Sequence, residues 1–173
     1  MEENQLKTGK FAWTYGAIGG GIGIVFTLML MSMDMLYDQG WGKSVVSTLI
    51  LVAVIILAIF NFKKQNQGFL SLKQALKVGV GTALVAALVA LVFTYLLTNF
   101  FVPDFMDKTA ELSRITIKEK NPQITPEQLD NAIEMQKKFF WIAYPMILIF
   151  NLFIGFIVSL ISGLIMKKEG AAN

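Results

Sequence analysis

Cysteine and histidine are both absent from the 173-residue sequence, and charged residues make up only 16% of it. Without them the chain has no disulfide, no thiolate nucleophile and no histidine to bind haem or zinc. Acid–base or metal chemistry would therefore rest on Asp, Glu and Lys alone, and the sequence shows no cluster of carboxylates. We expect a protein that is not an enzyme and that carries no cofactor and no metal.

Concentrated positive charge is also lacking. The net charge is +3, and the basic residues are scattered along the chain instead of alternating with aromatic residues on one surface. This pattern gives no indication of nucleic-acid binding. The basic isoelectric point is better explained by lysines that flank membrane-spanning segments.

What the chain has in excess is apolar sequence. Hydrophobic residues reach 55% of the chain and the mean hydropathy is +0.60. A soluble domain is typically about 45–50% apolar, and here the excess falls into long uncharged blocks. The sequence therefore predicts an all-α, polytopic membrane protein that forms a single membrane domain over residues 1–173.

Four uncharged blocks are long enough to be transmembrane helices. Each has about 19 residues or more, which at about 1.5 Å per residue spans a hydrocarbon core of about 30 Å. None contains an ionisable residue at depth, the usual sign of an ion or proton pathway. We place the four spans at about 11–35, 44–62, 76–101 and 139–166.

The connection before the third span has an amphipathic pattern. Between Gly68 and Lys77, apolar Phe69, Leu72 and Leu76 fall on one helical side, and Lys73 falls on another. This arrangement is typical of a helix that lies in the membrane interface. We expect a short interfacial helix that leads into span three.

Residues 104–138 form the one long extramembrane segment. Thr125-Pro-Glu-Gln128 is a strong helix start, with a capping Thr, a Pro at the first helical position and a Gln that completes a capping box. No helix breaker separates it from span four. A first helix over 104–120, with a turn at Asn121-Pro122, would complete a helical hairpin that extends spans three and four beyond the bilayer. Pro145 is expected to bend the start of span four.

Lysines indicate the orientation. Lys63 and Lys64 end span two, and Lys167 and Lys168 end span four, whereas the 104–138 segment carries seven acidic and six basic residues. The positive-inside rule therefore favours cytoplasmic termini and a periplasmic hairpin. Lys137 and Lys138, which adjoin span four, are the main evidence against this orientation.

Small residues recur at four-residue spacing in three spans. Such residues let helix backbones approach closely in lipid, where apolar burial gives little driving force for association. Spans one, three and four are therefore expected to pack tightly, while the Val/Ile/Leu-rich span two is free to face lipid. The positions are Gly16, Gly19, Gly20 and Gly23 in span one, Gly79, Ala83 and Ala87 in span three, and Gly155, Ser159 and Gly163 in span four.

Asn151 stands out among the few polar residues deep in the spans. One interpretation is a hydrogen bond to a neighbouring helix, and the other is a place on a substrate or ion path. The Gly19-Gly20-Gly21 run likewise has two interpretations: helix packing, or an unwound helix that lines a binding site.

The order of these features resembles a family of small four-helix bacterial membrane proteins of unknown function, widespread in the Bacteroidota. The most specific part is Gly68–Thr82, in which a Phe-x-x-x-x-x-Ala-Leu-Lys-Val-Gly pattern enters span three. The resemblance covers nearly the whole chain and implies an inner-membrane location. Its motifs describe topology and packing, and they bring no catalytic residues with them.

Three functions fit this pattern. A non-catalytic subunit, scaffold or assembly factor would use the 104–138 hairpin to bind another membrane-protein subunit. A small transporter or channel would act as a homo-oligomer and use Asn151. A lipid-handling protein would contact membrane lipids through the segment at Phe69–Lys77.

Overall fold

The computed structural model describes residues 7–37 and 40–168, and this part of the chain is helical apart from turns and one isolated backbone bridge. Four helices are long and apolar enough to cross a membrane, which confirms the predicted all-α, multi-pass architecture. In chain order the helices are α1 (Thr8–Ser32), α2 (Gly42–Gln65), α3 (Leu72–Leu96), α4 (Phe105–Lys120), α5 (Pro126–Phe139) and α6 (Ala143–Met166).

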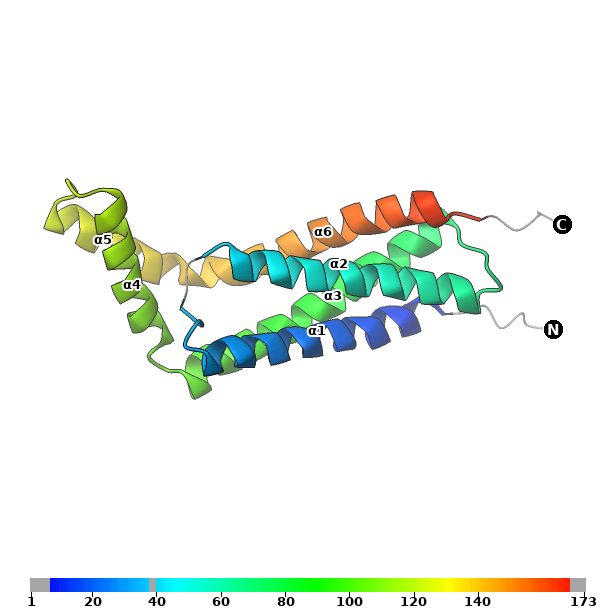
Figure 1. Cartoon of the computed structure of the whole chain (residues 1–173), viewed down its shortest axis with the longest axis horizontal. Coiled ribbons are helices and arrows are strands. Elements are labelled where there is room, and N and C mark those ends of the chain that lie inside the picture. Colours follow the sequence, from blue (N-terminus) through cyan, green and yellow to red (C-terminus); the bar gives the residue numbers. More distant parts are fainter. Residues whose placement is uncertain (1–6, 38–39, 169–173) are drawn as a thin grey trace.

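Helix α3 is the centre of the bundle, and it packs against α1, α2 and α6 (Figure 1). Its most extensive contacts are with α1 and α6. These are the three helices with small residues at four-residue spacing, so close backbone approach explains why they pair. Both described chain ends, at Lys7 and Lys168, lie at the end of the bundle opposite the α4–α5 hairpin (Figure 1).

Helix α2 is exposed on one side, as expected, at residues such as Leu57 and Phe60, but its other side is buried in the bundle. It contacts α1, α3 and α6, and it contributes the fully buried side chains of Ile55, Ile59 and Phe62 to the core. The Phe62 ring meets Phe11 edge-on at 5.3 Å between centroids. Helix α1 is the more exposed span, with outward-facing Trp13 and Val25. Composition misled because bulky apolar side chains suit a protein core and a lipid surface equally well.

The prediction of a separate interfacial helix before span three is wrong. Gly68 has a φ of +85°, which suits glycine, and turns the chain; Leu70 then pairs with Lys168 in an antiparallel bridge. Helix α3 starts directly after Ser71, whose side chain completes a capping box with Gln74. The segment from Leu72 to Lys77 is therefore the first part of the spanning helix.

The hairpin is attached to the bundle in two different ways. Helix α5 begins at the Thr125–Gln128 capping box, as expected, and continues through a 3₁₀ turn at Phe140–Ile142 into α6. Pro145 accounts for this turn, because it cannot donate a hydrogen bond to the carbonyl four residues earlier. Helix α4 does not extend α3: after a π-helical turn at Leu97–Phe101 the chain changes direction, and α4 runs across the end of the bundle (Figure 1).

Candidate functional site

The bundle is tightly packed at one end and open at the other. Toward the C-terminal end of α2, Ile55 and Phe62 have no exposed surface. Toward its N-terminal end, on the hairpin side, Val45 and Leu49 are 42% and 61% exposed. Exposure alone does not distinguish the two ends, since Leu57 is 51% exposed, but on the hairpin side residues of α1, α2 and α6 line an open space.

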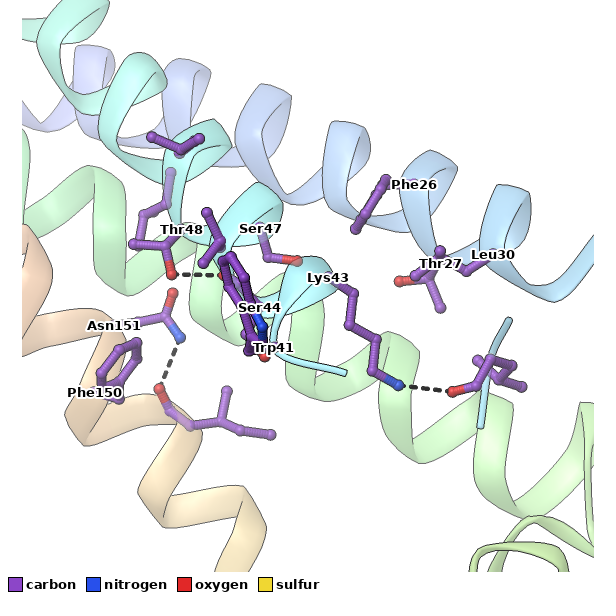
Figure 2. Close-up of a pocket in the computed structure, with 15 residues that line it drawn as sticks. Phe26, Thr27, Leu30, Trp41, Lys43, Ser44, Ser47, Thr48, Phe150 and Asn151 are labelled. Carbon is purple, nitrogen blue, oxygen red and sulfur yellow. Dashed lines mark hydrogen bonds between the residues drawn. The ribbon is translucent and has the colours of Figure 1, made fainter. Parts of the chain in front are cut away.

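This space is a groove of about 720 Å³, lined by α1, α2, α6 and the α1–α2 connection (Figure 2). Small-molecule sites in proteins usually have volumes of about 300–1,000 Å³. Most of the lining is apolar, from residues such as Phe26, Leu30 and Phe150. Leu49 and Phe150 both line the groove and are more than half exposed, so it opens outward between α2 and α6.

A smaller cavity of about 250 Å³ adjoins the groove, because the two share five lining residues. It reaches between α1 and α3, to Gly23, Ala90 and Thr94. A Cβ atom added to Gly23 would meet no heavy atom within 4 Å. Gly23 is thus a cavity-lining residue in this bundle, and not the helix contact that its spacing predicts. The shared residues are Thr27, Ser47, Leu51, Ile147 and Asn151.

Asn151 points into this space together with Thr27 and Thr48 (Figure 2). Its amide nitrogen donates to the Ile147 carbonyl at 2.8 Å, within α6. Asn151 therefore does not make the hydrogen bond to a neighbouring helix that one interpretation of the sequence predicted. Thr27 donates to the Gly23 carbonyl and Thr48 to the Ser44 carbonyl, each four residues back in its own helix.

Lys43 and Trp41 lie at the mouth of the groove, at the start of α2. The Lys43 ammonium donates to the Leu36 carbonyl at 3.0 Å, and this bond ties α2 to the α1–α2 connection (Figure 2). Lys43 is half-buried, and it is the charged member of the described lining. The Trp41 side chain is 79% exposed at the same level, as expected for an interfacial tryptophan.

The other small residues lie where helix backbones approach closely. A Cβ atom on Gly79 would overlap Ser159, and one on Gly155 would overlap Ala83. These contacts join α3 to α6. The remaining positions are buried as well: Gly16 lies against Val85, Gly20 against Val89, Gly19 against Val54, and Gly163 against Leu72 and Ala75, and Ala87 is 1% exposed.

The α4–α5 hairpin has its own interior. Ala110 and Ile133 are buried between the two helices, and Gln136 donates to the Ser113 hydroxyl at 3.1 Å. Two ion pairs cross the hairpin, Arg114–Asp130 at 2.5 Å and Lys137–Asp107 at 2.6 Å. The sequence predicted the helix pair and places Ile133 and Gln136 on one stripe of the second helix, but only the tertiary structure decides which residues of α4 they meet.

Aromatic residues join the hairpin base to the groove. Phe105 of α4 contacts Tyr37 of the α1–α2 connection at 5.6 Å and Phe140 at 6.2 Å between ring centroids. Phe140 contacts Tyr144 of α6 at 6.0 Å. Tyr37 directly follows Leu36, a groove residue, so this aromatic cluster (Tyr37, Phe105, Phe140 and Tyr144) connects the two candidate surfaces.

Lys108 lies beside this cluster, with its ammonium 5.7 Å from the centre of the Tyr37 ring. It also forms an ion pair with Asp104 at 2.8 Å. The hydrogen bond that the Lys108 ammonium donates to the Asp104 carboxylate is the main cause of a raised pKa at Lys108. The side chain therefore stays charged at neutral pH, as its contact with the ring requires.

Comparison with known proteins gives a family and no function. The family model described as "Protein of unknown function (DUF4199)" matches residues 14–168. No curated protein and no solved structure matches the chain.

Proposed function

The chain belongs to the DUF4199 family of proteins of unknown function, and we propose that it is a non-catalytic membrane protein that binds a partner protein through the α4–α5 hairpin. The observation that carries this proposal is apolar surface on a polar element. The α4–α5 hairpin is rich in charged residues, yet three of its large apolar side chains are exposed. Leu112 and Ile115 of α4 are 37% and 52% exposed, and Met135 of α5 is 59% exposed.

Position on the helix supports a binding role for these residues. Leu112 and Ile115 are three residues apart, so they share one face of α4, away from the inward-facing Ala110 and Ser113. Apolar side chains that the hairpin does not need for its own interior are the usual anchors of protein interfaces. The protein partner is a subunit of another membrane protein or a second copy of this chain.

A preorganised hairpin would also bind with a smaller entropic cost. The Thr125–Gln128 capping box fixes the start of α5, and the Arg114–Asp130 and Lys137–Asp107 pairs hold the two helices together. These ion pairs are exposed, so each contributes no more than about 1 kcal/mol. Their value for binding is that they limit the hairpin to one arrangement before the partner arrives.

The non-catalytic part of this proposal is supported by the amino-acid sequence. Neither His nor Cys occurs, and Asp and Glu would need a concentrated arrangement to serve as acid–base or metal groups. On the described hairpin, Asp104, Asp107 and Asp130 instead form ion pairs with Lys or Arg side chains.

The proposed location is the bacterial inner membrane, with cytoplasmic termini and a periplasmic hairpin. The C-terminal end of α2, the start of α3 and the end of α6 lie at one end of the bundle (Figure 1). That end carries Lys63, Lys64, Lys73 and Lys77, with Lys168 close by, at the bridge to Leu70. Clustered lysines of this kind support placing that end in the cytoplasm.

The alternative function is that of a small transporter or channel, formed by a homo-oligomer. The groove with Asn151 supports this alternative, because the polar side chains of Thr27, Thr48 and Asn151 gather in it among the apolar spans. The apolar lining of the groove and the lack of an ionisable residue at its inner end favour the interaction proposal.

The test is cross-linking in the source cell. A photo-reactive amino acid at position 115 or 135 should cross-link one defined partner, which mass spectrometry of the purified adduct identifies. Ile115→Glu and Met135→Glu should each reduce recovery of that partner at least about tenfold, because a buried unpaired charge costs well over 1.4 kcal/mol at an interface.

Lys120→Glu is the matched control, since Lys120 is an exposed α4 residue five positions from Ile115, which places it off the proposed binding face, and it is in none of the hairpin ion pairs given above. It should leave the partner in place. Unchanged partner recovery in Ile115→Glu and Met135→Glu would overturn the proposal.

A further inference from the structure

We propose that the groove between α1, α2 and α6 binds an anionic phospholipid, with one acyl chain inside the groove and the phosphate at Lys43. The site is separate from the hairpin surface, so this inference goes beyond the proposed protein partner. It rests on the shape, the lining and the charge of the groove.

The depth of the groove suits an acyl chain. Lys43 lies at the start of α2, and Leu51, which also lines the groove, lies eight residues further along the helix. At about 1.5 Å per residue this places Leu51 about 12 Å deeper in the membrane. The groove therefore runs from the level of the lipid headgroups into the hydrocarbon region, and its opening between α2 and α6 lets a chain enter sideways.

The lining suits an apolar occupant, although it contains polar residues. The hydroxyls of Thr27 and Thr48 and the amide of Asn151 already donate to carbonyls of their own helices. The two threonine hydroxyls therefore need no water molecule or polar ligand as an acceptor, and one N–H of the Asn151 amide is satisfied as well. The remaining surface comes mainly from large apolar side chains, including Phe26, Leu30, Leu49 and Phe150.

Charge complementarity selects an anionic headgroup. Lys43 is the charged residue of the described lining, and no carboxylate of the described chain lies in that lining. Its ammonium is held at the mouth by one hydrogen bond to the Leu36 carbonyl, which leaves two N–H donors for a phosphate. Trp41 lies at the same level, where an amphipathic ring packs beside headgroups.

A phospholipid fits better than a small soluble anion. A groove of about 720 Å³ is far larger than one phosphate group, and its apolar walls give such an ion no further donors. The favourable energy of filling this groove comes from the acyl chain, which replaces empty or disordered space with packed contacts.

Native mass spectrometry of the detergent-purified protein tests this proposal. The probes are palmitoyl-oleoyl phosphatidylglycerol, which is anionic, and phosphatidylcholine with the same chains. We expect the wild type to bind phosphatidylglycerol about tenfold more tightly, the size of one charge-assisted hydrogen bond. Lys43→Gln should abolish this preference, and Lys43→Arg should retain it. Lys64→Gln, an exposed lysine at the other end of α2, should bind like the wild type.

A second pair of variants tests the place of the acyl chain. Ser47 lines both cavities, so Ser47→Phe should fill the space and weaken phosphatidylglycerol binding about tenfold or more. Val46 is 41% exposed and does not line the groove. Val46→Phe therefore adds an aromatic ring outside the groove and should leave phosphatidylglycerol binding unchanged. A thermal melt of each variant separates lost binding from lost folding.

Three results would overturn the proposal. The first is an unchanged headgroup preference in Lys43→Gln, and the second is wild-type binding by a folded Ser47→Phe. The third is competition by soluble glycerol 3-phosphate at the lipid's own concentration, which would make the groove a site for a free phosphate compound.

Discussion

Ser159 occupies the space that a side chain at Gly79 would need. A Cβ atom on Gly79 would overlap both the hydroxyl and the Cβ atom of Ser159, and would also approach Ile55 to 3.0 Å. The Ser159 hydroxyl in turn donates to the Gly155 carbonyl, one turn earlier in α6. Helices α3, α6 and α2 therefore meet at a point that only glycine permits.

Gly79→Ala should destabilise the bundle by about 1–3 kcal/mol, the usual cost of overpacking a close contact. Unfolding in mixed micelles, followed by circular dichroism, measures the change. Gly21→Ala is the control, because a Cβ atom there has open space, and it should be neutral or slightly stabilising. Adding Ser159→Gly to Gly79→Ala should restore part of the lost stability. A Gly79→Ala protein as stable as Gly21→Ala would contradict the observed contact.

Ile55→Ala should also destabilise the protein, by about 2 kcal/mol or more, because the side chain is fully buried and its loss leaves a cavity. Leu57 lies two residues away in α2 and is 51% exposed, so Leu57→Ala should have a much smaller effect. The same unfolding measurement compares them. Equal losses of stability in Ile55→Ala and Leu57→Ala would contradict the burial of α2 on its Ile55 side.

Phe105→Ala should loosen the hairpin on the bundle. Phe105 contacts both Tyr37 and Phe140, and each aromatic pair contributes about 0.5–1.5 kcal/mol. Spin labels at Glu119 and Ser32 would report a broader distance distribution by pulsed electron paramagnetic resonance. Phe101, which is 66% exposed, provides the control substitution Phe101→Ala. An unchanged distribution in Phe105→Ala would show that the aromatic cluster does not hold the hairpin.

Asn151→Leu should change the stability by less than about 1 kcal/mol. The amide donates within α6, so its removal breaks no bond between helices. Micelle unfolding checks this value, with Ser159→Leu as the contrasting variant because Ser159 is fully buried against α3. A large loss of stability in Asn151→Leu would mean that Asn151 joins α6 to another helix after all.

The outcome for Asn151 shows where sequence reasoning stops. Its polarity and depth marked it as unusual, but neither of the two interpretations described its bond to Ile147. The groove around it was not predicted either, because it is formed by Thr27, Ser47 and Leu51 on other helices. The ring contacts of Phe105 with Tyr37 and Phe140 were not predicted either, because the three residues lie far apart in the chain.

The sequence by itself determined the features that depend on neighbours along the chain. Long uncharged runs specify four spanning helices, because each backbone polar group must be satisfied within its own segment in lipid. The Thr125–Gln128 box specifies a helix start for the same local reason. Only the tertiary structure decided that α3 is central, that α2 is buried at Ile55 and Phe62, and that the hairpin end is open. These features depend on which helix faces which, and apolar side chains satisfy a lipid surface and a packed interior equally well.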